Sequence, residues 1–304
     1  MRMLSALVFV LLCLFVSSPA FSQSGPAPAA APTPQEMALS AAIAAAQQVL
    51  QPGPQDVPLA GQALLSLPAG YGFVPAAEAG QYLKALGNIP GDALAGLVVP
   101  LESQQGEWFA VVEYVASGYI RDDDAKEWDA DALLASLRAG TEASNEQRAQ
   151  MGIPALEIIG WMELPQYDAD TQRLVWSIAS RSHGQPTDAD NGINYNTYAL
   201  GREGYFSLNL VTAQSLVAQH KPAAHTLLTA LQFDEGKRYA DFNPDTDKVA
   251  EYGLAALVAG AAAKKLGLLA TLTVFLAKFW KLLLMGVVGV GYAARKGFGK
   301  KAAG

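Results

Sequence analysis

Cysteine is almost absent from this sequence of 304 residues, and its one example, Cys13, lies in an apolar N-terminal stretch. If that stretch is removed during export, the mature chain holds no cysteine. A disulfide framework, a thiolate metal site and a cysteine nucleophile are then excluded. Export remains compatible with this composition, because a domain of about 200 residues can bury enough apolar surface to be stable without disulfides.

Histidine is also scarce, and His183, His220 and His225 are the three examples. His220 and His225 are five residues apart, which does not place them on one helical face, and Pro222 between them predicts a break between two helices. The sequence contains no His-Glu-x-x-His run, no Gly-x-Ser-x-Gly nucleophile elbow and no P-loop. We therefore expect surface or loop histidines, no catalytic residue, no cofactor and no metal, and we lean against an enzyme.

Residues 1–22 have the pattern of a signal peptide. Arg2 gives a positive start, residues 3–16 are apolar, and small residues suited to cleavage follow. The apolar run is too short to cross about 30 Å of hydrocarbon at about 1.5 Å per residue. An uncleaved N-terminal anchor is the alternative. Proline and alanine dominate the next stretch, so residues 23–58 are interpreted as a spacer followed by a short helix.

Acidic residues are missing from residues 252–294, and this long stretch consists mostly of Gly, Ala, Leu, Val and Phe. We interpret residues 248–304 as a membrane anchor with a basic cytoplasmic tail. Lys278 and Lys281 would be membrane-embedded charges, each costing roughly 2.5–3.5 kcal/mol at the bilayer centre, which the many apolar neighbours offset. One span over residues 266–290 and two shorter kinked segments both fit, so the number of spans stays open.

Charge is divided unevenly along the chain. Residues 23–247 carry 27 acidic and 11 basic side chains, a net charge of −16, whereas residues 248–304 carry one acidic and nine basic side chains, a net charge of +8. The basic C-terminus is expected on the cytoplasmic side of the inner membrane, which places the exported domain in the periplasm. Membrane lipid is then one partner, and an envelope protein or self-association supplies another. A body this acidic lacks the basic surface that nucleic acid requires, so we expect no nucleic acid partner.

Short apolar runs alternate with turn and helix signals in residues 59–247, which we interpret as one soluble domain. Alternate residues such as Trp108 and Val112 share one face, as in a half-buried strand. Turns such as residues 201–204 join neighbouring strands, which then pair antiparallel, and Gly140 predicts the end of a helix. We predict the α+β class: a mainly antiparallel sheet with covering helices, with an α/β/α sandwich as one form of it, followed by C-terminal transmembrane helical segments.

The densest polar stretch lies between this domain and the anchor, at residues 236–247. The side chains that we select as a candidate partner or ligand site, one of them from an earlier turn, are Arg202, Lys237, Arg238, Tyr239, Asp241, Asn243, Asp245 and Asp247. A structured linker, in which Thr246 or Asp247 caps the membrane helix, is the alternative. The three aspartates at residues 122–124 lack the alternating spacing of a calcium loop, so a solvated acidic turn is expected there.

Several segments together resemble a bacterial family of membrane-anchored proteins, the domain of unknown function 2167. The residues that carry the resemblance are Gly160-Trp161, Pro165-x-Tyr167-Asp168, Leu174-x-Trp176, Asn194-Tyr195, Leu200-Gly201-Arg202-x-Gly204, Leu208-Asn209-Leu210 and the stretch from Tyr239 through Asp247 and Lys248 to Ala255. The resemblance covers most of residues 59–295. It implies an anchored envelope protein and transfers no activity, ligand or catalytic residue. The strand–helix alternation is also similar to the α/β/α sandwich of the photosystem-accessory PsbP type.

The leading hypothesis is a membrane-anchored envelope protein whose domain is a non-catalytic binding or accessory module at the outer face of the inner membrane. An envelope hydrolase that uses Asp168 or Asp241 with a histidine is the first alternative, although Asp168 lies in a turn where aspartates usually bond the backbone. The second is an oligomeric membrane assembly built on the Gly/Ala-rich tail, with Lys278 and Lys281 inside it. Gly253, Gly260 and Gly267 would allow helices of such a tail to pack closely.

Overall fold

The computed structural model describes residues 33–101, 108–126, 128–150, 152, 154–186 and 190–259. The predicted signal peptide, residues 1–22, and the predicted anchor from residue 260 onward, with Lys278 and Lys281, lie outside the described residues. Within the described part of the chain, no helix is both long and apolar enough to cross a bilayer.

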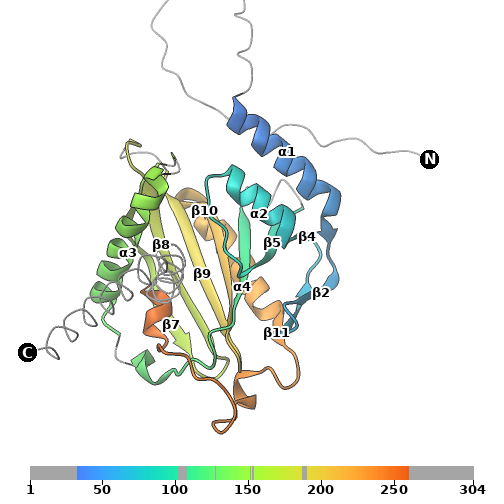
Figure 1. Ribbon diagram of the computed structural model, residues 1–304, viewed down its shortest axis with the longest axis vertical. Coiled ribbons are helices and arrows are strands. Elements are labelled where there is room, and N and C mark those ends of the chain that lie inside the picture. Colours follow the sequence, from blue (N-terminus) through green and yellow to red (C-terminus); the bar gives the residue numbers. More distant parts are fainter. Residues whose placement is uncertain are drawn as a thin grey trace, which may run out of the picture.

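One sheet of eight strands forms the centre of the domain (Figure 1). Every neighbouring pair in it is antiparallel. Short turns join β7 to β8 and β9 to β10, whereas β6 pairs with β10 from a distant part of the chain. In sheet order the strands are β1 (Gln51–Pro52), β4 (Tyr71–Pro75), β5 (Leu94–Pro100), β6 (Phe109–Val115), β10 (Tyr205–Ala213), β9 (Gly192–Leu200), β8 (Arg173–Ser182) and β7 (Leu156–Asp168). The prediction of an α+β domain with a mainly antiparallel sheet is confirmed.

Side chains of the central hairpin, β9 and β10, enter two separate cores, one on each face of the large sheet. Tyr205 pairs with Leu200 at one end of the hairpin, and Ala213 pairs with Gly192 at the other. Successive residues of a strand point to opposite faces. Phe206 therefore enters the first core, on one face of the sheet. Tyr205 enters the second core, on the opposite face.

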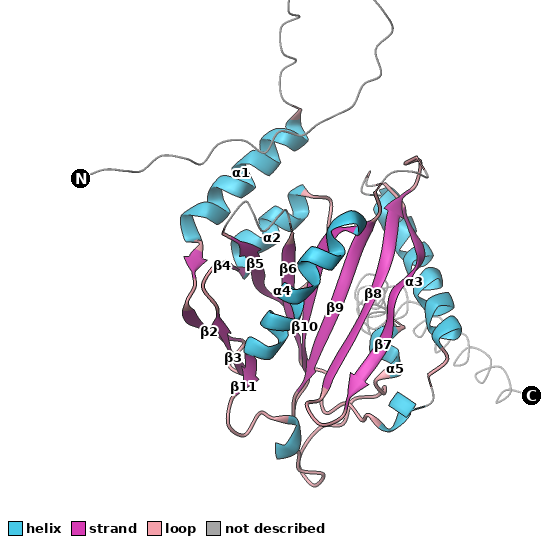
Figure 2. Ribbon diagram, turned by 180° about the vertical axis from the view of Figure 1, so that it is seen from behind, coloured by secondary structure: helices cyan, strands magenta, loops and turns pink. Residues whose placement is uncertain are grey.

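The first of these cores is closed by a small sheet and one helix. The small sheet has the order β11-β3-β2 and comprises β2 (Gln55–Leu59), β3 (Ala63–Leu67) and β11 (Leu231–Phe233). Helix α4 (Val217–Ala230) lies across β9 and β10 (Figure 2). Leu65 of β3 and Leu227 of α4 are both fully buried in this core, together with Phe206.

Pro222 does not divide two helices, and the prediction of a break there is wrong: α4 runs through it without interruption. A proline inside a helix removes one backbone hydrogen bond and costs about 3 kcal/mol. The four residues of α4 that follow it and face the sheet, Ala223, Ala224, Leu227 and Leu228, are buried. Burial of their apolar surface against the sheet offsets the cost of the missing bond.

The opposite face of the large sheet carries two separate helices. Helix α2 (Ala76–Ala85) covers β4 and β5, and α3 (Ala130–Gln150) lies along β7 (Figures 1 and 2). Helix α1 (Pro34–Val49) packs on α2. Helix α3 does not end at Gly140 as predicted. It continues because Asn145 and Arg148 in its second half bond to the backbone of Leu156 and Pro154.

The domain extends past both ends of residues 59–247. Strands β1 and β2 lie in the stretch interpreted as a spacer, yet β1 pairs with β4 and Val57 of β2 is buried. At the other end, helix α5 (Ala255–Val258) lies in the second core with α3. Leu254, Leu257 and Val258 are 0–4% exposed. Residues 248–259 are therefore an integral part of the domain.

Candidate functional site

The turn between β9 and β10 presents Arg202 and Glu203, and its two glycines fix how closely other segments approach. A Cβ atom on Gly201 would collide with the ring of Phe233, and one on Gly204 would collide with the carbonyl oxygen of Val115. The side chains of Arg202 and Glu203 consequently lie directly against the segment that follows β11.

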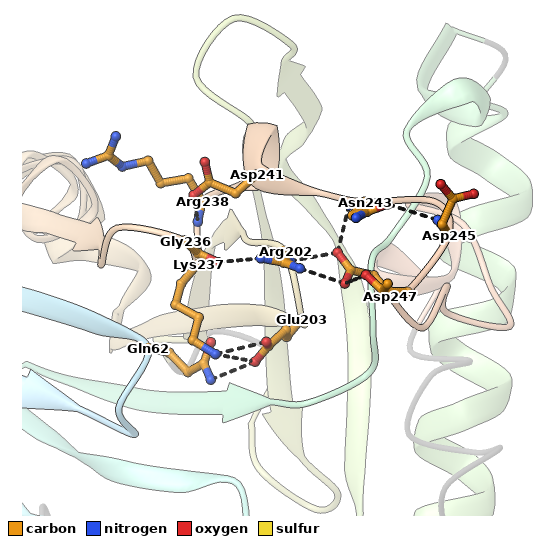
Figure 3. A network of polar contacts seen from close by, with 11 residues as sticks. Gln62, Arg202, Glu203, Gly236, Lys237, Arg238, Asp241, Asn243, Asp245 and Asp247 are labelled. Atoms are coloured by element: carbon orange, nitrogen blue, oxygen red, sulfur yellow. Dashed lines mark hydrogen bonds and ion pairs between the residues drawn. The ribbon is translucent and has the colours of Figure 1, made fainter.

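Arg202 forms a two-pronged ion pair with Asp247 (Figure 3). Its Nε lies 2.6 Å from Asp247 Oδ2, and its Nη2 lies 2.8 Å from Asp247 Oδ1. A third nitrogen, Nη1, donates to the carbonyl oxygen of Gly236 at 3.2 Å. The hydrogen bonds from Arg202 hold the pKa of Asp247 below its usual range, and the same contact raises the pKa of Arg202. This fork-to-fork geometry is the most directional ion pair available to side chains.

Glu203 makes the second ion pair of the site, with Lys237. The Lys237 ammonium lies 2.8 Å from both carboxylate oxygens of Glu203, and the Gln62 side chain donates to one of them at 3.0 Å. The hydrogen bond from Lys237, followed by that from Gln62, lowers the pKa of Glu203. Backbone contacts run alongside, since the Arg202 N–H donates to the Lys237 carbonyl at 2.9 Å. We call Gln62, Arg202, Glu203, Lys237 and Asp247 the Arg202 network.

The remaining polar residues selected from the sequence organise the backbone of residues 238–247. Asp241 accepts a hydrogen bond from the Arg238 N–H, and Asn243 accepts one from the Asp245 N–H. Asp247 Oδ2 accepts a further bond from the Asn243 N–H. The side chains of Arg238 and Asp245 are exposed and extend away from the Arg202 network (Figure 3). Both charges are open to a partner.

Tyr239 fixes the same segment to the second core. Its hydroxyl donates to the carbonyl oxygen of Ile120 at 2.8 Å, and its ring stacks on Tyr119 at 4.4 Å between centroids. The ring of Phe242 also stacks on Tyr119, with 3.8 Å between the two ring centroids. Tyr119 also bridges to Val249 in a parallel β-bridge. Residues 236–259, which we call the exit segment, are thus bonded to the domain along most of their length.

The acidic run at residues 122–124 is part of this attachment, which sequence reasoning missed. Asp124 accepts hydrogen bonds from the backbone N–H groups of Leu254 and Ala255, at 3.1 and 3.0 Å, and so caps α5. Thr246 and Asp247, the expected caps, are used elsewhere: Thr246 donates its hydroxyl to Asp247. Asp122 accepts a bond from the Tyr167 hydroxyl at 2.8 Å. Local sequence carries no signal for these contacts, because the partners lie far apart in the chain.

The two aspartates of the hydrolase alternative, Asp168 and Asp241, each bond within a turn of their own. The carboxylate of Asp168 accepts bonds from Thr171 and from the Asp170 N–H in its own turn. The hydrogen bond from the Thr171 hydroxyl is the main cause of a lowered Asp168 pKa. Of the histidines, His183 and His225 are exposed as expected, whereas His220 is 1% exposed, and its Nδ1 lies 2.6 Å from the Thr212 hydroxyl.

A second polar cluster joins the edge of the sheet to α4, and no sequence motif pointed to it. Tyr195, which is 1% exposed, donates to Glu163 at 3.0 Å, and its hydroxyl lies 3.0 Å from His225 Nε2. Lys221 donates to the same Glu163 oxygen at 2.7 Å. Burial of the phenol, followed by the charge of Glu163, raises the pKa of Tyr195. A register shift in β7 between Trp161 and Glu163 turns Glu163 toward this side.

The chain belongs to the family described as Protein of unknown function (DUF2167), whose model matches residues 51–289. No curated protein matches the chain. Among solved structures, the cyanobacterial PsbP protein of Synechocystis sp. PCC 6803 is similar over 61% of this chain and 93% of its own, at 12% identity and a TM-score of 0.36. The Saccharomyces cerevisiae Ran-binding protein Mog1p is similar over 58% of this chain and 89% of its own, at 12% identity and a TM-score of 0.28.

Proposed function

We propose that this protein is a membrane-anchored envelope protein, and that its domain is a non-catalytic binding or accessory module presented at the outer face of the inner membrane. The proposal rests on the sequence of the two ends, an apolar start after Arg2 and an apolar, acid-free stretch from residue 252 to residue 294. Under the positive-inside rule, the basic residues that follow this stretch would lie on the cytoplasmic side.

The attachment of the exit segment determines how an anchor that follows it would hold the domain. The ion pair of Arg202 with Asp247, the bridge of Tyr119 with Val249 and the cap of Asp124 hold it to the domain. A membrane segment later in the chain would therefore follow a stretch that is bonded to the domain as far as the buried Leu257 and Val258.

The proposal of a binding module is supported by the charges of the site, some of which are paired within the chain and some of which are exposed. Asp247 and Glu203 are each paired with a cation of the same chain, and Asp241 bonds the backbone of its own turn. These carboxylates organise the exit segment. The exposed Arg238 and Asp245 beside them are the groups through which a protein partner would bind.

Location is tested on intact cells and on spheroplasts that express the full chain with a tag after Gly304. We expect external protease to digest the domain only after the outer layer is opened, and to leave the tag intact. Recovery of the whole chain in the soluble cytoplasmic fraction would overturn the anchored, exported assignment.

The partner surface is tested by cross-linking in cells with Arg238→Ala and Asp245→Ala combined. A matched control combines Lys84→Ala with Asp92→Ala, two exposed charges elsewhere on the domain. We expect the cross-linked species of the wild type to be lost in the first variant and retained in the control. An identical cross-linking pattern in all three proteins would exclude this surface as the binding site.

A further inference from the structure

Glu113 of β6 is an acidic residue that lies between two apolar cores. The other side chains of β6 on its face of the large sheet are Phe109, Val111 and Val115. Val115 packs against the second core, whereas Phe109 and Val111 pack against a third core. This third core lies beneath α2 and consists of Val74, Ala79, Leu83 and Leu97. In the sheet order, β6 stands between the strands under α2 and the strand under α3, and the two helices lie apart on this face (Figure 1).

No cation neutralises this carboxylate within the described part of the chain. None of the ion pairs there includes Glu113, and no hydrogen bond from a described residue reaches it. Burial raises the pKa of Glu113, because the charged form loses hydration and gains no partner. On the neighbouring strand β10, Asn209 Oδ1 is also shielded from solvent and accepts no hydrogen bond. Buried acceptors normally have a donor, so this part of the sheet lacks one.

The exit segment ends beside the same part of the sheet. Helix α5 is buried in the second core together with Tyr205 of β10. Burial, followed by nearby phenols such as Tyr252 and the charge of Glu113, raises the pKa of Tyr205. Tyr252 of the exit segment and Glu113 of β6 thus lie beside the same side chain.

The next cations along the chain follow this point closely. After Ala259 come Gly260, three alanines and then Lys264-Lys265, the first basic residues beyond Lys248. Five residues of extended chain span at most about 18 Å. Strands β10 and β6 are adjacent, and adjacent strands lie only about 5 Å apart. The lysine pair is therefore within reach of the carboxylate of Glu113.

The short connection also favours these lysines over any free cation. A group tethered by a short segment has an effective concentration in the millimolar range at its target. An ammonium group has three N–H donors, so it can serve both Glu113 and the buried oxygen of Asn209. Exposed acids such as Glu251 stay hydrated, and a surface ion pair there would contribute little.

We propose that Lys264-Lys265 returns to this face of the sheet and that one of its two ammonium groups pairs with Glu113. The contact would extend the attachment of the exit segment beyond Ala259. It depends only on the order of residues along the chain, so it holds whether or not the apolar stretch that follows crosses a membrane.

The test is a double-mutant cycle on the full chain in mild detergent, measured by urea unfolding. Glu113→Gln removes one charge of the pair, and Lys264→Gln with Lys265→Gln removes the other. We expect each change alone to lower the urea midpoint by roughly 0.5 M, and all three together to be no worse than the more harmful one. An unpaired carboxylate predicts the opposite sign for Glu113→Gln, because a neutral amide is easier to bury.

A matched control changes an acid that the proposal does not use. Glu251→Gln alters an exposed carboxylate of the exit segment, and it should keep both the wild-type midpoint and the full effect of the two lysine changes. The contact itself is measured on the wild type with a carbodiimide, which joins a carboxylate directly to a neighbouring amine. We expect a cross-linked peptide pair that contains Glu113 and Lys264 or Lys265. This measurement stands even if a variant does not fold.

A higher urea midpoint for Glu113→Gln, or losses that add up in the cycle, would overturn the proposal. Wild-type cross-links that never join Glu113 to either lysine would also overturn it. A cross-link from Glu113 to a second copy of the chain or to another protein would assign the carboxylate to an external partner instead.

Discussion

The carboxylate of Asp124 accepts a hydrogen bond from the backbone N–H of Leu254 at 3.1 Å, across a separation of 130 residues. Gly253 passes so close that a Cβ atom there would lie 2.5 Å from an oxygen of the same carboxylate. The cap of α5 therefore depends on two residues together: an acid on one loop and a glycine on the exit segment. This contact connects the last described helix to the domain.

Asp124→Ala should lower the free energy of unfolding by about 1–2 kcal/mol, the usual cost of losing a helix cap. Urea unfolding of the full chain in mild detergent, followed by tryptophan fluorescence, measures it. Asp123→Ala is the control, because Asp123 is exposed beside Asp124. Equal stability of the two variants would show that the cap does not hold the exit segment.

The sequence predicted the class of fold because strand alternation and turn residues are local signals. Trp108 and Val112 are both buried in one core, as their period of two indicated. The same reasoning failed at Pro222 and Gly140, where tertiary contacts override a local break. Burial of Leu227 and Leu228 stabilises α4 across Pro222. The hydrogen bond from the Leu156 N–H to Asn145 stabilises α3 beyond Gly140.

The candidate site shows the same division. The polar density of residues 236–247 led to Lys237, Asp241 and Asp247, and in the structure Arg202 bonds to Asp247 and to the carbonyl oxygen of Gly236. Glu203 and Gln62 were missed, because their roles depend on how the β9–β10 turn and the β2–β3 turn meet the exit segment. Pairing between distant turns leaves no periodic pattern that a single sequence could show.

Arg202→Ala and Asp247→Ala should each lower Tm by roughly several degrees, and the double variant should be little worse than the more harmful single one. The reason is that both residues act in one two-pronged ion pair. Thermal unfolding of the four proteins completes the cycle. Additive losses would indicate that the two side chains act independently, for example through the bond of Asp247 to the Asn243 N–H alone.

Gly204→Ala should destabilise the domain by about 1–3 kcal/mol, the usual cost of forcing an extra methyl group into a packed site. The added Cβ atom would collide with the backbone carbonyl of Val115, which has no side-chain freedom to move away. Gly91→Ala is the matched control, since open space surrounds that position. Urea unfolding compares the two variants, and a Gly204→Ala protein as stable as the control would contradict the close approach of the turn to β6.

The ion pair of Asp247 should make stability depend on pH in the acidic range. Its pKa in the folded protein lies below the ordinary value of 3.8, so the folded state binds fewer protons there than the unfolded state. The contribution is complete above that ordinary value and is lost as pH falls through the lowered pKa. The difference in Tm between the wild type and Asp247→Asn should therefore be constant near neutral pH and shrink below about pH 4. A difference that stays constant or grows as pH falls would mean that the carboxylate of Asp247 is not selectively stabilised by Arg202.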